Sequence, residues 1–207
     1  MLTERFTQAV DYAREAHASQ TRKGTSVPYI AHLLGVASLV LEYGGDEDQA
    51  IAALLHDAIE DQGEHHEAII RRQFGDRVAD IVLACTDGTQ SSKAAAVTLE
   101  DKRADWQQRK RRYLAHLSEA AGDALLVSAC DKLHNALAIL AGLRDPAIGA
   151  AVFDRFTEKR DGTLWYYREI ARVFSQCNVS VAGTLSAVIA EMCSAAESAR
   201  AAQVSDR

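Results

Sequence analysis

This sequence has few prolines and no closely spaced pair of cysteines, and each of these features excludes some classes of protein. Only Pro28 and Pro146 occur in 207 residues, whereas alanine is abundant, and that balance favours helices. The four cysteines are scattered and form no CxxC pair, which argues against a structural zinc site and against a disulfide framework. We therefore expect a helical protein of a reducing cytoplasm.

Long apolar runs are also missing. No stretch of about 18 apolar residues occurs, so the sequence predicts no transmembrane helix. Residues 1–17 alternate charged and apolar side chains and lack the uninterrupted apolar core of a signal peptide. The formal net charge of −6 disfavours wholesale binding to nucleic acid. Neither a membrane nor a stable nucleic-acid partner is therefore expected, and the sequence leaves the oligomeric state open.

What the chain has in abundance is helical periodicity. Apolar residues recur with a 3.6-residue period, and period-2 strand patterns, internal repeats and Pro/Gly/Ser-rich linkers are missing. The pattern predicts helices over residues 2–19, 30–43, 46–59, 64–74, 76–85, 98–117, 124–143, 146–160, 163–176 and 178–201. Residues 20–29 and 87–97 read as loops. We expect one all-α domain over residues 1–201, followed by a tail, 202–207, that frays.

The most informative segment is AALLHDAIED at residues 52–61. It carries His56, Asp57, Glu60 and Asp61 within six residues of an otherwise apolar stretch. On a continuous helix, His56 and Glu60 share a face, and so do Asp57 and Asp61. Burying acids is costly unless a cation or hydrogen bonds compensate, and a metal ion would do so. An exposed helix end, where acids need no partner, is the alternative.

Two further polar residues lie within apolar segments. His32 is flanked by Ile30, Leu33 and Leu34, and Asp131 lies in LLVSACDKLHNALAIL. A lone buried histidine is usually a satisfied core residue, whereas an unpaired buried carboxylate is costly. With His56 and Asp57, these residues supply two imidazoles and two carboxylates. Such a mixed set suits one divalent cation of intermediate hardness, such as Mn²⁺ or Fe²⁺.

The order of these residues, a His, a His-Asp pair and a distant Asp, resembles that of the HD phosphohydrolase superfamily. Four segments look like its alarmone hydrolase branch: RKGTSVPYIAH, AALLHDAIED, FGDRVADIV and ACDKLHNA, at residues 22–32, 52–61, 74–82 and 129–136. That branch includes the hydrolase half of the bifunctional ppGpp synthetase/hydrolases and the stand-alone small alarmone hydrolases. This chain resembles the stand-alone form, because it has neither the length nor the extra domains of the bifunctional enzymes.

The resemblance implies an all-α HD-domain fold and a hydrolytic activity. His32, His56, Asp57 and Asp131 would hold one Mn²⁺ ion, with Fe²⁺ or another divalent cation as alternatives. Glu60 and Asp61 match the family's acidic pair, which activates or orients the attacking water. The reaction would remove the 3′-pyrophosphate of (p)ppGpp or (p)ppApp and leave a nucleoside 5′-phosphate.

The same resemblance suggests which residues contact the nucleotide. Arg22 and Lys23 match an RK pair, in which a guanidinium can stack on a base and an ammonium can neutralise phosphate. Asn135 matches an Asn that contacts the nucleotide in the family. Tyr167 matches a Tyr that the family places on a late helix near the nucleotide. Lys110 matches a residue that contacts the pyrophosphate. For each of them the alternative is an ordinary solvated or core residue. His17, His134 and the His65–His66 pair read as bystanders.

The sequence also departs from the family pattern. Leu33 stands where a Pro is common, and Leu137 and Ala138 replace the Arg and Thr of the family's HNMRT segment. If that Thr helps to bind the nucleotide, the base or ribose contact differs here. Guanine specificity is therefore open, and adenine alarmones or NADPH are alternative substrates.

Two other functions compete with alarmone hydrolysis. One is an HD phosphatase that acts on NADPH or another nucleotide monophosphoester and releases orthophosphate. The other, of a different class, is a nucleotide-binding sensor without turnover. The presence of all four candidate ligands together with Glu60 and Asp61 argues against a sensor, because a sensor has no need for a water-activating pair.

Overall fold

The computed structural model describes residues 1–88, 98–119 and 122–205, and these residues form an assembly of helices without strands. An isolated antiparallel bridge joins Thr21 to Pro28 in the loop after the first helix. The helices are α1 Glu4–Ala16, α2 Ile30–Glu42, α3 Glu47–Leu55, α4 Ala58–Gln62, α5 His66–Phe74, α6 Asp76–Cys85, α8 Leu99–Leu117, α9 Gly122–Arg144, the 3₁₀ helix η1 Gly149–Arg155, α10 Lys159–Gln176 and α11 Ala182–Ser205. The all-α prediction is confirmed.

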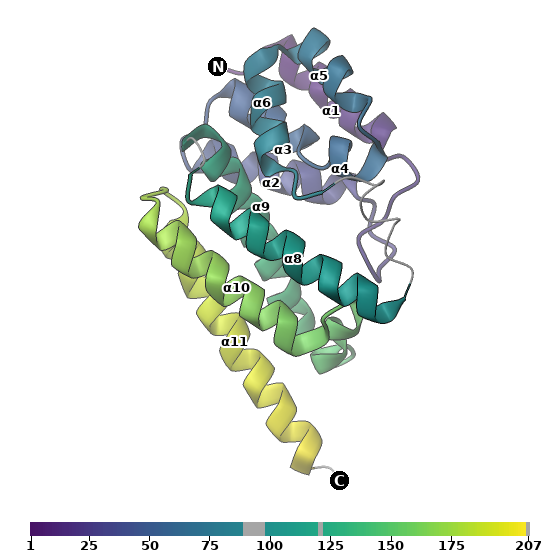
Figure 1. Ribbon diagram of the computed structural model, residues 1–207, viewed down its shortest axis with the longest axis vertical. Coiled ribbons are helices and arrows are strands. Elements are labelled where there is room, and N and C mark those ends of the chain that lie inside the picture. The colour runs from purple at the N-terminus through teal and green to yellow at the C-terminus, as the bar shows by residue number, and fades with distance from the viewer. Residues whose placement is uncertain (89–97, 120–121, 206–207) are drawn as a thin grey trace.

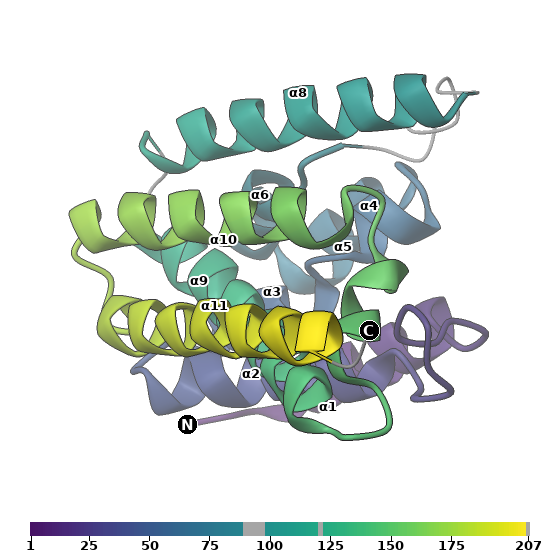
Figure 2. The same cartoon turned by 90° about the horizontal axis from the view of Figure 1, so that it is seen from below.

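Helix α9 forms the centre of the core. It packs against α2, α3, α6, α11 and η1, and Figure 1 shows it running behind α8 through the middle of the molecule. Seen from below, α8, α10 and α11 lie in successive layers (Figure 2). The N-terminal helices α1 to α6 gather at the other end of the molecule (Figure 1). Residues of α2, α3 and α9 therefore meet in the interior.

Helix α9 is also long and apolar enough to cross a membrane by length and composition alone. An 18-residue stretch of this helix has a mean hydropathy of 1.4, but 67% of that stretch is buried inside the protein. A core helix passes the same test, because the interior of a large helical assembly is as apolar as a membrane span. Its polar residues Asp131 and Lys132 point into the site described below rather than toward a membrane.

The sequence predicted one continuous helix over residues 46–59, and this prediction is wrong. Helix α3 ends at Leu55, and α4 begins only at Ala58. The imidazole Nδ1 of His56 lies 2.8 Å from the carbonyl oxygen of Ala53. In a continuous helix that carbonyl would accept from the amide of Asp57, so the side chain competes with the helix backbone. The break sets the directions of His56 and Asp57 independently of α4.

The prediction of a helix over residues 146–160 is also wrong. The side chain of Asp145 accepts a hydrogen bond from the amide of Ala147 at 2.9 Å, which stabilises a turn. Gly149 then has a φ of +52°, a conformation that glycine adopts readily and that interrupts a right-handed helix. A 3₁₀ helix, η1, follows up to Arg155. This short element brings Arg155 toward the site.

Other boundaries shift by a few residues. Helix α10 begins at Lys159 and α11 at Ala182, and α11 continues to Ser205, past the expected domain end at residue 201. Only residues 206–207 of the expected tail lie outside the described part. The predicted loop 87–97 is described at Asp87 and Gly88, and the rest of it lies outside the described residues.

Candidate active site

Four side chains from three parts of the chain converge in the core. His32 comes from α2, His56 and Asp57 from the junction of α3 and α4, and Asp131 from α9. His32 Nε2 lies 3.2 Å from Asp131 Oδ1 and 3.8 Å from Asp57 Oδ2. His56 Nε2 lies 3.0 Å from Asp57 Oδ2 and 3.6 Å from Asp131 Oδ1. The structure thus brings together the four residues that the sequence predicts as metal ligands, although their binding of a metal stays a prediction.

The hydrogen bonding of His56 leaves one nitrogen without a partner. Because the Ala53 carbonyl can only accept, the Nδ1 atom of His56 carries the hydrogen of that bond. Its Nε2 atom is buried and has no hydrogen-bond partner among the described residues. In the neutral ring this nitrogen presents a lone pair to two carboxylate oxygens, an arrangement that a cation between them would stabilise. The donor set therefore fits a divalent metal ion.

Electrostatics in this buried cluster favour cation binding. Burial opposes the charged form of His56, but the carboxylates of Asp57 and Asp131 outweigh it and raise the pKa of His56 well above its usual range. Burial likewise disfavours the Asp131 carboxylate, yet the Lys132 ammonium, with His32 and His56, holds its pKa well below the usual range. Both effects favour an ionised carboxylate beside a positive charge. A metal ion would take the place of the proton on His56.

Neighbouring side chains fix the two carboxylates. The hydroxyl of Tyr29 donates to Asp57 Oδ2 at 2.6 Å. Lys132 donates to Asp131 Oδ2 at 2.5 Å, and the amide nitrogen of Asn135 donates to Asp131 Oδ1 at 2.6 Å. Such supporting hydrogen bonds orient carboxylates toward a metal. Asn135 lies on the same face of α9 as Asp131, as its spacing predicts.

The acidic pair of α4 divides between two environments. Glu60 lines a pocket beside the cluster, and its Oε2 accepts a hydrogen bond from the amide of Asp87 at 3.2 Å. Asp61 instead accepts a hydrogen bond from Gln20 at 2.8 Å and is not part of the described pocket wall. Neighbouring residues on a helix point about 100° apart, so the two carboxylates do not share a direction. Glu60 is the better placed of the two to meet a ligand.

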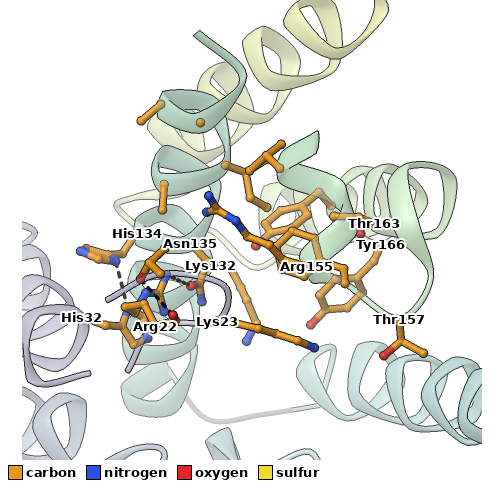
Figure 3. Close-up of a pocket in the computed structure, with 18 of the residues that line it drawn as sticks. Arg22, Lys23, His32, Lys132, His134, Asn135, Arg155, Thr157, Thr163 and Tyr166 are labelled. Atoms are coloured by element: carbon orange, nitrogen blue, oxygen red, sulfur yellow. Dashed lines mark hydrogen bonds between the residues drawn. The ribbon is translucent and has the colours of Figure 1, made fainter. Parts of the chain in front are cut away.

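The pocket has a volume of about 940 Å³ and a strongly basic lining. Seven cationic side chains contribute to its wall: Arg22, Lys23, Lys102, Arg109, Lys110, Lys132 and Arg155. Figure 3 shows His32, Arg22, Lys132 and Asn135 on one side of the pocket and Arg155, Thr163 and Tyr166 on the other. A wall of this charge and size suits a small ligand with several phosphate groups.

All five predicted substrate contacts, Arg22, Lys23, Lys110, Asn135 and Tyr167, line this pocket. The guanidinium of Arg22 donates to Asn135 Oδ1 at 2.7 Å, so the loop after α1 is tied to α9. Tyr167 is buried at 7% exposure, with one edge on the pocket. The structure places these residues together, whereas their contact with a nucleotide stays a proposal.

Asp87 organises the basic residues of α8. One of its carboxylate oxygens accepts from Arg109 at 2.9 Å, and the other pairs with Lys110. Burial raises the pKa of Asp87, but Lys110 and the other nearby cations outweigh it and lower that pKa to about 2. In the basic run 109–112, Arg109 and Lys110 face the pocket while Arg111 and Arg112 are exposed.

Sequence reasoning missed several pocket residues. Lys132 follows Asp131 directly, and this adjacency could have identified it. Trp106 and Arg155 carry no such signal, because nothing in their own segments indicates that α8 and η1 meet at one cavity. His134, read as a bystander, lies with its Nδ1 2.9 Å from Nδ1 of His32 and also lines the pocket. Burial lowers the pKa of His134 to about 4.

Comparison with known proteins shows related sequences in animals and bacteria. A protein of Xenopus tropicalis named guanosine-3′,5′-bis(diphosphate) 3′-pyrophosphohydrolase MESH1 is 37% identical over 131 residues, which is 62% of this chain and 65% of that protein. The Drosophila melanogaster protein of the same name is 30% identical over 134 residues, 63% of this chain and 67% of that protein. A pyrophosphohydrolase of Aquifex aeolicus is 45% identical over 83 residues, 40% of this chain but only 12% of that protein.

Solved structures show the same fold. One, described as a metazoan ortholog of SpoT that hydrolyses ppGpp and plays a role in starvation responses, has a TM-score of 0.72 at 22% identity and covers 92% of this chain and 97% of its own. The crystal structure of lmo0812 from Listeria monocytogenes has a TM-score of 0.62 at 25% identity and covers 80% of this chain and 95% of its own.

These comparisons confirm the resemblance drawn from the motifs. The matched stretch spans less than two thirds of the Xenopus relative and a small part of the bacterial one. A family model described as the HD domain matches residues 9–162, a stretch that includes His32, His56, Asp57 and Asp131. Since that match covers well over half of the sequence, and the fold agrees with it, the chain belongs to the HD-domain family.

Proposed function

We propose that this chain is a Mn²⁺-dependent pyrophosphohydrolase that removes the 3′-pyrophosphate from (p)ppGpp or (p)ppApp and leaves a nucleoside 5′-phosphate. The observation that carries the proposal is the buried Nε2 of His56, which lies 3.0 Å from Asp57 Oδ2 and 3.6 Å from Asp131 Oδ1 beside a basic pocket of about 940 Å³. Relatives named as ppGpp pyrophosphohydrolases support the substrate class.

His32, His56, Asp57 and Asp131 would hold the metal through two imidazole nitrogens and two carboxylates. When bound, a divalent ion supplies positive charge that polarises a phosphoryl oxygen and makes water more acidic. The mixed nitrogen and oxygen donors favour Mn²⁺, with Fe²⁺ or another divalent cation as alternatives. Tyr29, Lys132 and Asn135 hold the carboxylates in place during binding.

Glu60 would act as the general base. Its carboxylate lies on the pocket wall and is oriented by the amide of Asp87. It would take a proton from the attacking water while the oxygen of that water bonds to the phosphorus next to the ribose. The bond from this phosphorus to the ribose 3′-oxygen breaks and pyrophosphate leaves. The 3′-oxygen takes a proton from solvent, and Glu60 releases its own proton to solvent. Asp61, held by Gln20, would help to orient the acidic helix rather than touch the substrate.

The cationic wall would neutralise the substrate's phosphates. Lys23 and Lys110 are suited to phosphate, and Arg22 can stack on the base with its planar guanidinium. Asn135 and Tyr167 complete the predicted contacts from α9 and α10. The partner is therefore a small-molecule nucleotide, and the unpaired cysteines among the described residues favour a cytoplasmic setting.

One observation favours a second candidate, a phosphatase acting on NADPH or another nucleotide monophosphoester. Ala138 lines the pocket where the family pattern has a threonine, so a contact to the nucleotide is missing there. A non-catalytic nucleotide sensor is a weaker alternative, because Glu60 faces the pocket and a sensor does not require a general base.

The test is to incubate the purified protein and Mn²⁺ separately with ppGpp, ppApp and NADPH, and to resolve the products by anion-exchange chromatography. Pyrophosphate with GDP or ADP supports the proposal and names the base. Orthophosphate from NADPH alone supports the phosphatase. Binding of a nucleotide without turnover of any of the three would favour the sensor.

A further inference from the structure

His134 contacts the candidate ligand His32 from the side opposite the carboxylates. The two Nδ1 atoms lie 2.9 Å apart, as the dashed line between these residues marks in Figure 3. The Nε2 atom of His32 faces the other way, toward Asp131 and Asp57. His32 is 1% exposed, so water has little access to either of its nitrogens. The proton arrangement of His32 therefore depends on His134.

The two ligand histidines are supported in parallel ways. His56 donates its Nδ1 hydrogen to a backbone carbonyl, which leaves its Nε2 lone pair for a cation. If His32 binds the same cation through Nε2, its hydrogen must lie on Nδ1 and must be donated to Nδ1 of His134. In metal sites, such a hydrogen bond fixes the tautomer and the ring orientation of the ligand.

A small residue on α2 makes room for this contact. A Cβ atom at Gly35 would lie 2.3 Å from Nε2 and 2.5 Å from Cδ2 of the His134 ring. Contacts this close do not occur in folded proteins, so any larger residue at position 35 must displace the ring. The absence of a side chain at Gly35 therefore allows His134 to reach His32 across the interface of α2 and α9.

We propose that His134 is a positioning residue for the metal centre. It accepts the Nδ1 hydrogen of His32, and the absence of a side chain at Gly35 leaves room for its ring. This role rests on the metal site of the proposed function but not on its substrate. It makes the hydrogen-bond acceptor at position 134, rather than the shape of the side chain, the property on which metal affinity depends.

Three substitutions at position 134 distinguish a need for a hydrogen-bond acceptor from a need for the shape of the side chain. His134→Asn places an amide oxygen near the position of Nδ1, His134→Gln places it nearer the position of Nε2, and His134→Phe fills the space without an acceptor. We expect the Phe and Gln variants to lose on the order of 10- to 100-fold in Mn²⁺ affinity, the usual cost of losing such a partner. The Asn variant should retain most of the affinity.

The measurement is a titration of the metal-stripped full-length protein with Mn²⁺, in which electron paramagnetic resonance reports the free ion and no nucleotide is present. Thermal unfolding of each variant checks that it is folded. His116→Phe, an exposed histidine on α8, is the matched control and should bind Mn²⁺ as the wild type does. Gly35→Ala alone should weaken Mn²⁺ binding. Added to His134→Phe, it should weaken binding little further, because both substitutions remove the same contact between His134 and His32.

Two results in the variants would overturn this role while leaving the metal centre in place. Equal Mn²⁺ affinity of the wild type and the Phe variant would show that no acceptor is needed at position 134. Equal loss in the Asn and Phe variants would show that shape rather than acceptance matters. A wild-type protein that bound no Mn²⁺ would instead refute the metal centre and this role together, whereas normal metal binding without nucleotide turnover would refute only the proposed substrate.

Discussion

The Nε2 atom of His32 lies 3.2 Å from Oδ1 of Asp131, although these residues belong to two helices far apart in the sequence. The contact crosses the interface between α2 and α9, which is formed by buried apolar side chains on both helices. Because such an interior is closely packed, small shifts of either helix would change the distance between the two atoms. The geometry of the candidate metal centre is thus set by packing of the core.

Replacing Asp131 with Ala should abolish metal-dependent turnover. The change removes a carboxylate that faces both histidines and leaves Lys132 and Asn135 without their partner. Mn²⁺ affinity and hydrolysis should fall together, as measured by metal titration and by product chromatography. Asp11→Ala, on the exposed face of α1, is the control. Unchanged activity in the Asp131 variant would exclude it as a ligand.

Replacing Glu60 with Gln should keep the metal and slow the reaction. The amide can still accept the Asp87 hydrogen bond but cannot take a proton from water. We expect kcat to fall by on the order of 10²-fold or more, the usual scale for a general base. The check is kcat together with the Mn²⁺ content of the variant. Loss of the metal would make Glu60 a ligand instead.

Replacing Arg155 with Gln should raise KM more than it lowers kcat. Arg155 lines the pocket on the side away from His32, and the structure shows no hydrogen bond or ion pair between its guanidinium and other described residues (Figure 3). A charged hydrogen bond to phosphate contributes about 1.5–3 kcal/mol, so KM should rise on the order of 10-fold or more. Arg111→Gln, exposed on α8, is the control. An unchanged KM would show that Arg155 does not contact the substrate.

Replacing Ala138 with Thr should change base preference. The new hydroxyl would enter the pocket at the position where the family pattern has a threonine. A neutral hydrogen bond contributes about 0.5–1.5 kcal/mol, so the ratio of kcat/KM for ppGpp to that for ppApp should rise by roughly 2- to 10-fold. Ala138→Val, which adds similar bulk without a hydroxyl, is the control. Equal ratios in the Thr and Val variants would contradict the hydroxyl contact.

Replacing Asp46 with Ala should destabilise the fold without touching the site. The Asp46 carboxylate caps α3 by accepting from the amide of Gln49 at 3.0 Å, and such a cap contributes about 0.5–2 kcal/mol to the free energy of unfolding. Partial burial raises the pKa of Asp46, but the Gln49 amide and Arg77 outweigh it and lower that pKa below its usual range.

A lowered pKa in the folded state means that the stabilising effect of the Asp46 charge is present above the unfolded pKa of about 3.9 and is lost as pH falls through the folded value. The difference in free energy of unfolding between wild type and Asp46→Ala should therefore shrink in acid. Urea unfolding at several pH values measures it. Asp46→Asn, which keeps a capping oxygen but no charge, should cost less than Ala and vary less with pH. If the difference in free energy of unfolding between wild type and Asp46→Ala stayed constant with pH, the Asp46 charge would not contribute to stability.

The candidate ligands could be predicted because each combines a polar group with an apolar setting. Asp131 in the core helix and the His56-Asp57 pair are unusual in such surroundings, and burial makes an unpaired charge there costly. The break after Leu55 was not predictable in the same way. It depends on the imidazole of His56 bonding to the Ala53 carbonyl, and periodicity of apolar residues does not report such competition between side chain and backbone.

The sequence by itself determined the all-α class, most helix positions, the HD-type ligand order and the residues available as an acidic pair. These features depend on local spacing and on the identity of individual side chains. Only the tertiary structure decided that Glu60 faces the pocket while Asp61 bonds to Gln20, that Arg155 reaches the cavity, and that His134 supports His32. The physical reason is that periodicity tells which face of a helix is buried, whereas the packing of all helices decides which buried faces meet.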